Sequence, residues 1–419
     1  MTGNLLDYLI EYGDTPFSEM RFTEVDAAVL CRLSYYNFEG IVPDIKSDMP
    51  SVSLANIMLM EDHDDIFEKG KYEEVSRQMV GLMLKGRRFK GLRLACFSSC
   101  LDRETQTQFA AITFMTGPRR MFVVFRGTDR TLIGLKEDFN LLYTDHAKCH
   151  DYAVEYLKVI SRRYSHKIYV GGHSKGGHLA VYAAMQMPPE ISGRIHRIYS
   201  MDGLGLRPSL MRDGKFKAIE DKLYKLLPQS SLIGMMLEDD GHYEVVSSTG
   251  LALIQHNLLT WEVDGKRFVR RRKLANNAVF VEHTFNGWVE SQDDYNRKRF
   301  IDGIYSLIDA CEAEHLSNLI SDGGRKLVMI LENIKELDDE SKEQIKTVLK
   351  AFVVVAKFYL RSDVGEGIKK SARTETKKLI NGSKKALNSG MKAISSGKKA
   401  LSTSREVLKK GTAAIKRVL

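Results

Sequence analysis

The residues from Gly172 to Gly176 read Gly-His-Ser-Lys-Gly, a G-x-S-x-G pattern. Such a pattern presents a serine hydroxyl at the apex of a sharp turn, where it acts as the nucleophile of acyl transfer. The apolar run at 167–171 predicts a strand before the turn, and the small and apolar residues at 176–186 predict a helix after it. Glycines two positions from the serine are expected because neighbouring chain passes too close for a Cβ atom. Ser174 is therefore the candidate nucleophile.

A serine hydroxyl needs a general base, and that base needs a partner that orients it. His256 is the candidate base, with His283 and His242 as rivals. It follows a strand predicted at 243–248, in a loop that can return the imidazole to the tips of the strands. This position also satisfies the chain order serine, acid, histidine.

Three aspartates satisfy the same order as the acid. Asp202 ends the strand predicted at 194–201, and the glycines after it leave room for the carboxylate. Asp239 and Asp240 follow the next strand, predicted at 231–237. We expect Asp202, with Asp240 and then Asp239 as alternatives.

The tetrahedral intermediate needs donors aimed at its oxyanion. The first expected donor is the backbone N–H of Lys175, directly after the nucleophile. The second is the N–H or the hydroxyl of Thr128, in an Arg-Gly-Thr segment that follows the buried strand predicted at 120–125.

The spacing of the elements predicts an α/β fold. Residues 1–90 read as a helical region packed on the core, and strands alternate with helices over 91–310, which indicates a largely parallel sheet. Helices are predicted at 311–361, followed by a basic tail at 362–419. The remaining predicted elements are strands at 92–98 and 108–115, a helix at 145–163 and a helical stretch at 208–227.

The composition is that of an ordinary globular protein, with 43% hydrophobic and 28% charged residues. Five cysteines at scattered spacings predict neither a disulfide framework nor a zinc site, and no metal or cofactor is expected. The N-terminus lacks the features of a secretory signal, so the expected location is the cytoplasm.

The positive charge lies in the tail. Residues 368–419 hold 15 Lys or Arg and two Glu, a balance of +13, whereas the whole chain carries +9, so the rest carries about −4. From Lys377 a seven-residue repeat places apolar and small residues on one side of a helix and lysines elsewhere. Three interpretations are open: the tail binds an anionic membrane, it pairs with a partner helix, or it is a solvated tail without a target. The glycines of the repeat also allow a free tail that is disordered and folds on contact. The absence of aromatic residues argues against nucleic acid.

Two segments resemble the class 3 lipase branch of the α/β-hydrolases, namely Val-Val-Phe-Arg-Gly-Thr-Asp at 123–129 and Gly-Gly-His-Ser-Lys-Gly-Gly-His-Leu-Ala at 171–180. Other segments resemble a bacterial lipase-like family of unassigned function, and this resemblance covers roughly residues 5–310. They are Gly127-Thr128-Asp129-Arg130-Thr131, Lys136-Glu137-Asp138-Phe139-Asn140, Asp202-Gly203-Leu204-Gly205, and Gln255-His256 shortly before Trp261. The first resemblance implies an α/β-hydrolase fold with its oxyanion hole at Arg-Gly-Thr, and places the acid at Asp239 or Asp240. The second favours Asp202.

One departure from class 3 lipases is Lys175, where those enzymes often carry an aliphatic residue. A cation beside the nucleophile predicts a preference for an anionic or phosphate-bearing substrate. The sequence thus predicts a serine esterase or lipase, acting on an acyl ester such as a phospholipid or lysophospholipid at the inner membrane surface. The alternative is a catalytically idle hydrolase-like scaffold that binds a membrane or a protein partner.

Overall fold

The structure is a computed structural model. It describes residues 2–60, 63–67, 72–129, 132–141, 143–231, 233–237, 242–250, 252–275, 286, 293–295 and 297–298. The helices predicted at 311–361 and the tail at 362–419 lie outside the described residues. So do Asp239 and Asp240.

A nine-stranded sheet forms the centre of the fold, in the order β1-β2-β3-β4-β5-β6-β7-β8-β11. Strands β4 to β8 pair in parallel, and β1 to β3 and β11 add antiparallel edges. The α/β fold is therefore confirmed. The strands are β1 (Val52–Ser53), β2 (Arg93–Asp102), β3 (Thr107–Gly117), β4 (Arg120–Phe125), β5 (Lys167–His173), β6 (Ile195–Met201), β7 (Leu223–Pro228), β8 (Tyr243–Val246) and β11 (Arg270–Arg271), beside a small hairpin of β9 (Val263–Asp264) and β10 (Arg267–Phe268).

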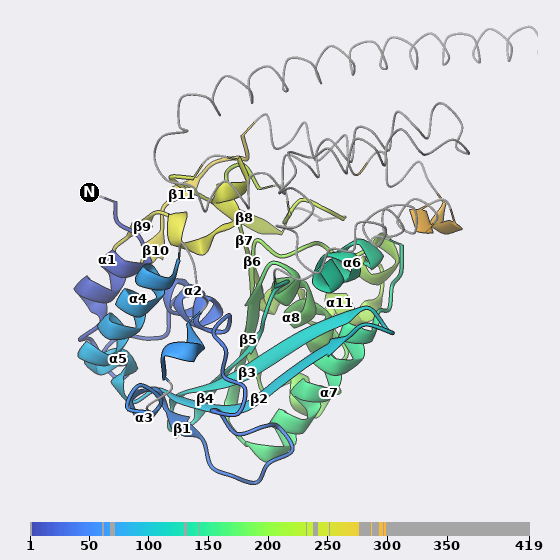
Figure 1. Ribbon diagram of the computed structural model, residues 1–419. Coiled ribbons are helices and arrows are strands. Elements are labelled where there is room, and N and C mark those ends of the chain that lie inside the picture. The colour runs from blue at the N-terminus through green and yellow to red at the C-terminus, as the bar shows by residue number, and fades with distance from the viewer. Residues whose placement is uncertain are drawn as a thin grey trace, which may run out of the picture. The chain divides into compact units, whose positions relative to one another are not determined.

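Helices cover both faces of this sheet (Figure 1). The N-terminal helices α1, α2, α4 and α5 lie on one side, and α7 and α8 lie on the other. The described helices are α1 (Leu5–Tyr12), α2 (Glu24–Leu33), α3 (Leu54–Ile57), α4 (Glu73–Lys85), α5 (Arg87–Lys90), α6 (Leu132–Asn140), α7 (Lys148–Arg163), α8 (Lys175–Met185), α9 (Pro189–Ser192), α10 (Pro208–Met211) and α11 (Gly214–Lys217), with 3₁₀ turns η1 (His63–Ile66), η2 (Glu220–Lys222), η3 (Ala252–His256) and η4 (Leu258–Thr260).

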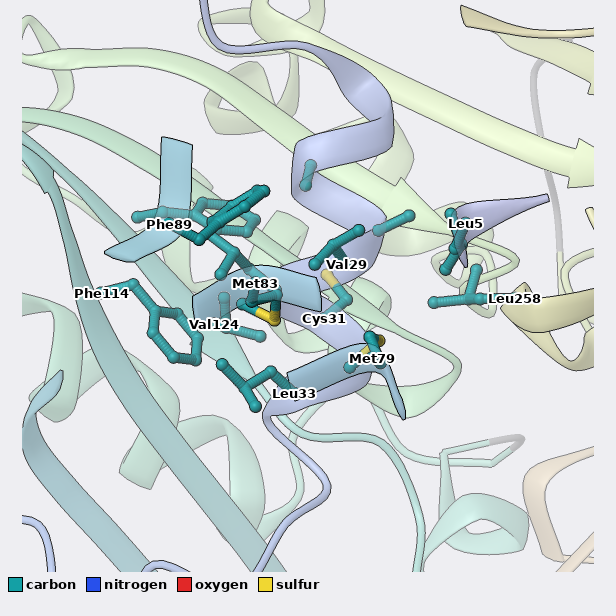
Figure 2. Close-up of a cluster of buried hydrophobic side chains, with 14 of the residues drawn as sticks. Leu5, Val29, Cys31, Leu33, Met79, Met83, Phe89, Phe114, Val124 and Leu258 are labelled. Carbon is teal, nitrogen blue, oxygen red and sulfur yellow. The ribbon is translucent and has the colours of Figure 1, made fainter. Parts of the chain in front are cut away.

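Side chains that alternate along the strands create two hydrophobic cores, one on each face. Phe122 and Val124 of β4 join the cluster under the N-terminal helices, whereas Val123 and Phe125 join the cluster under α7 and α8. Figure 2 shows the first cluster, with Phe114 and Val124 from the sheet beside Val29, Met79 and Met83 from the helices. Burial on both faces explains why the central strands read as continuous apolar runs.

Two predicted elements between β6 and β8 are wrong. The helical stretch predicted at 208–227 contains three short helical turns, and its last residues form the parallel strand β7. The strand predicted at 231–237 is wrong, because residues 233–237 form turns and bends, and neither they nor residue 231 pair with a strand. Short apolar runs do not distinguish a buried strand from other buried segments, so the pattern at Leu223–Pro228 favoured the wrong element.

Candidate active site

Ser174 occupies a strained turn between the central strand β5 and helix α8. Its backbone φ of 59° and ψ of −133° lie in a region that residues other than glycine rarely adopt. A Cβ atom at Gly172 would lie under 3.0 Å from the backbone of Gly176, and one at Gly176 would lie as close to the carbonyl oxygen of Phe125. The expected close packing around the turn is therefore present.

Asp202 and His256 come together at the carboxyl ends of the parallel strands. Asp202 follows β6 with a left-handed φ of 46°, and His256 ends the turn η3. His256 Nδ1 lies 2.7 Å from Asp202 Oδ2, and both side chains are buried. Because the carboxylate accepts the Nδ1 proton, the neutral imidazole keeps its acceptor lone pair on Nε2.

The loop at 231–237 holds the other oxygen of Asp202. Ser231 Oγ donates to Asp202 Oδ1 at 2.5 Å, and the backbone N–H of Gly234 donates to the same oxygen at 3.2 Å. Sequence reasoning missed both residues because it placed a strand here. The Ser-x-x-Gly spacing by itself carried no signal of a carboxylate partner.

His173, the residue before the nucleophile, connects the elbow to the loop that carries His256. Tyr35 Oη lies 2.8 Å from His173 Nδ1, and His173 Nε2 lies 2.6 Å from the backbone oxygen of His256. A carbonyl only accepts, so Nε2 carries the proton and Nδ1 accepts from the tyrosine. Burial, aided by the nearby His256, holds the pKa of His173 well below its ordinary value. His173 is thus a neutral group that fixes the backbone of His256.

His178, on α8, is held in one tautomer by His150 of α7 in a similar way. The backbone N–H of Ala147 donates to His150 Nδ1, so the proton of His150 lies on Nε2 and is donated to His178 Nε2 at 2.9 Å. His178 Nδ1 then donates to the carbonyl of Gly205 at 2.8 Å, in the loop after Asp202. Burial lowers the pKa of His178 to about 4, and burial with the neighbouring His178 lowers the pKa of His150 well below its ordinary value.

Thr128 lies on a loop that contacts the nucleophile. A Cβ atom added to Gly127 would lie 3.0 Å from Ser174 Cβ. Thr128 Oγ1 donates to Asp138 Oδ2 at 2.5 Å, while Asp138 Oδ1 is buried without a hydrogen-bond partner. Burial raises the pKa of Asp138 to about 6. When Asp138 is ionised, it accepts the hydroxyl proton of Thr128.

The side chain of Lys175 does not face a substrate, so the predicted cation beside the nucleophile is wrong. Lys175 is fully buried, and its Nζ lies 2.5 Å from Glu137 Oε2. The Nζ also donates to the backbone oxygen and to Oε1 of Gln108, at 2.6 and 2.8 Å. Burial alone would lower the pKa of Lys175, but the charges of Glu137 and Asp138 outweigh it and raise the pKa. The ammonium is therefore neutralised inside the protein, and only the backbone N–H of Lys175 remains for the site.

Within the described ranges, no group of three or more His, Cys, Asp or Glu side chains is arranged to hold a metal ion. Across the same part of the chain, no helix has the length and apolar character required to cross a membrane.

Comparisons with known proteins found one matching family model and weak structural similarity to two lipases. A family model described as Mbeg1-like matches residues 83–306, which is more than half of the chain. A Rhizomucor miehei lipase in complex with its propeptide is 15% identical with a TM-score of 0.27, and the match covers 38% of this chain and 57% of that one. M37 lipase is 14% identical with a TM-score of 0.30, and the match covers 50% of this chain and 68% of that one. The chain thus spans little more than half the length of the Rhizomucor lipase. No curated protein matches.

Proposed function

The chain belongs to the Mbeg1-like family, and we propose that it is a serine hydrolase that cleaves acyl esters through Ser174, His256 and Asp202. The observation that carries the proposal is the 2.7 Å hydrogen bond between His256 Nδ1 and Asp202 Oδ2 at the same sheet edge as the strained Ser174 turn. A buried carboxylate, a histidine held in one tautomer and an elbow serine in this chain order are the parts of a hydrolase triad.

In the acylation step, Ser174 Oγ attacks the ester carbonyl carbon while its proton passes to His256 Nε2. The carbonyl π electrons move to the oxygen, and the backbone N–H groups of Lys175 and Thr128 stabilise the resulting oxyanion. Asp202 stays ionised and stabilises the imidazolium. Collapse of the intermediate breaks the bond to the alcohol oxygen, which takes the proton from His256 and leaves as the free alcohol.

Deacylation repeats the sequence with water. His256 Nε2 removes a proton from water as the oxygen attacks the acyl carbon, and a second oxyanion forms between the same donors. Its collapse breaks the bond to Ser174 Oγ, which regains the proton from His256. A carboxylic acid leaves and the enzyme is restored.

We propose a lipid ester, such as a phospholipid or lysophospholipid, as the substrate class. The support is the family resemblance and the basic tail, which would bring the enzyme to the anionic inner surface of a membrane. The side chain of Lys175 contributes nothing to this preference, because its charge is buried against Glu137.

A non-catalytic scaffold is the rival function, and covalent labelling separates the two. A fluorophosphonate probe should label the wild-type chain and fail to label Ser174→Ala. A matched control is Ser76→Ala, which alters a buried serine in α4 on the opposite side of the sheet and should leave labelling intact. Absence of labelling in a folded wild-type chain, shown by a cooperative thermal transition, would favour the scaffold.

A further inference from the structure

We propose that the buried ion pair between Lys175 and Glu137 is a positioning device. It holds helix α6 against the nucleophile turn and so sets the two backbone donors of the oxyanion hole. This inference rests on the proposed function. It assigns neither residue to the chemistry itself.

Several hydrogen bonds hold the pair in place. All three protons of the ammonium have acceptors, because Lys175 Nζ contacts Glu137 Oε2 and both oxygens of Gln108. The backbone N–H of Gln108 donates to the same Glu137 oxygen at 3.2 Å. Strand β3, helix α6 and the first residue of α8 therefore meet at one buried cluster. Directional bonds to charged groups fix positions more tightly than apolar contact does.

The two neighbouring carboxylates of α6 reach both segments that would stabilise the oxyanion. Glu137 binds the side chain of Lys175, whose own N–H is the first donor. Asp138 binds the hydroxyl of Thr128, whose N–H is the second donor. A shift of α6 would therefore displace both donors relative to the carbonyl oxygen. A misplacement of about 1 Å is enough to cost about 100-fold in rate.

Stability alone does not explain this pair. Replacing a buried ion pair by apolar side chains of similar volume is often neutral or stabilising, whereas removing one partner leaves an unpaired charge in the interior. An apolar pair at these positions would fill the same space beside Cys149, a residue of α7 that belongs to the second hydrophobic core. What an apolar pair would lack is the direction that the charged pair imposes on α6.

The double variant K175M/E137L tests the inference in the full-length chain. Steady-state rates on a soluble p-nitrophenyl ester are expressed per serine titrated to completion with a fluorophosphonate, so that unfolded protein does not contribute. We expect kcat to fall about 10- to 100-fold with KM within about twofold, because only transition-state stabilisation is lost. The affinity for a boronic acid, which forms a tetrahedral adduct with the serine, should fall by the same factor as kcat.

The matched control is R88M/D26L, which replaces the fully buried ion pair between Arg88 of α5 and Asp26 of α2. Its kcat per titrated serine should stay within about twofold of wild type even where its melting temperature falls. The conservative variant E137Q keeps an acceptor for Lys175 and should recover most of the lost kcat.

Three outcomes decide the inference. An unchanged kcat per titrated serine in K175M/E137L overturns it, as does an equal loss in R88M/D26L. If the double variant folds too poorly to titrate, the same kcat and boronic acid measurements on Lys175→Arg decide instead, because the larger guanidinium does not fit the bonds of Nζ to Glu137 and Gln108, and an unchanged kcat there would also overturn the inference. A wild-type chain that neither labels nor hydrolyses any ester refutes the proposed function, which is a separate result.

Discussion

At the scale of single residues, the proposed triad depends on which nitrogen of His256 carries the proton. In Asp202→Asn the side chain keeps its shape, but its amide offers a donor to Nδ1 and favours the tautomer with the proton on Nε2. That imidazole cannot accept the proton of Ser174. We expect kcat to fall by about 10⁴ with little change in KM, measured on a soluble ester with folding checked by circular dichroism.

Ser231→Ala should lower kcat less than Asp202→Asn, because it weakens the support of the Asp202 carboxylate without removing it. It removes one of the two donors to Asp202 Oδ1 and leaves the N–H of Gly234 in place. A hydrogen bond to a charged group contributes about 1.5–3 kcal/mol, so a loss of about 10- to 100-fold in kcat is expected. A variant of Asp202 that keeps wild-type kcat would show that another group orients His256.

The sequence predicted the residues that would carry chemistry better than the residues that hold them in place. Ser174 follows from a local pattern, because the turn, its glycines and the strand before it are adjacent in the chain. Ser231, His173 and Glu137 act through partners 29, 83 and 38 positions away. Such contacts are set by the packing of the whole sheet, and no local spacing encodes them.

At the scale of elements, the histidine pair between α7 and α8 makes stability depend on pH. His150 and His178 are neutral in the folded protein, whereas an unfolded chain takes up protons as the pH falls below about 6.5. The folded pKa of His178 is lowered to about 4, so the stability that it contributes is present above 6.5 and is lost as the pH falls toward 4. For His178 alone this loss is on the order of 3 kcal/mol.

Urea unfolding of wild type and His178→Asn between pH 7 and pH 5 checks this dependence. Asparagine keeps a donor for the carbonyl of Gly205 but does not titrate, so the free energy of unfolding should decline less with falling pH than in wild type. Equal slopes in wild type and His178→Asn would contradict the buried neutral pair.

Replacing a glycine by alanine should have opposite effects at two positions in the fold. Gly176→Ala places a Cβ atom against the carbonyl of Phe125, so the turn must open and labelling of Ser174 should be lost. Gly81→Ala lies inside helix α4 with nothing within 4 Å of the added atom. It should raise the free energy of unfolding by about 0.5–1 kcal/mol, measured by urea denaturation. Full labelling of Gly176→Ala would show that the turn tolerates a side chain.

Helices and strands were predicted correctly where the sequence pattern fits only one kind of element. The strands predicted at 108–115 and 120–125 correspond to β3 and β4, which pair antiparallel, because turn residues separate two apolar runs. The prediction failed at β7 and at the following loop, where both segments are apolar and short. For such segments, pairing with the neighbouring strands of the sheet decides which one becomes a strand. Here Leu223–Pro228 pairs with β6 as β7, and the segment after it, which includes Gly234, binds Asp202 instead.

At the scale of the whole molecule, charge is divided between the body and the tail. Residues 368–419 carry +13 against about −4 for the rest, so an anionic surface would attract the tail and weakly repel the body. Each basic residue near such a surface contributes about 1 kcal/mol, and salt screens the attraction. The tail would then determine where the enzyme works, while the folded body determines what it cleaves.

Neutralising the tail in the full-length chain tests this division. Five lysines of the repeat are changed to glutamine, namely Lys377, Lys378, Lys384, Lys385 and Lys392. If the contributions of the five lysines added fully, about 5 kcal/mol of attraction would be removed. Because such contributions add only in part, flotation with phosphatidylserine vesicles should show an affinity lower by at least about 100-fold. The kcat on a soluble ester should not change, because the substitutions do not touch the proposed triad. Neutral phosphatidylcholine vesicles are the control and should bind neither form. Equal flotation of both forms with anionic vesicles would rule out electrostatic membrane binding by the repeat and leave a partner helix as the target of its apolar side.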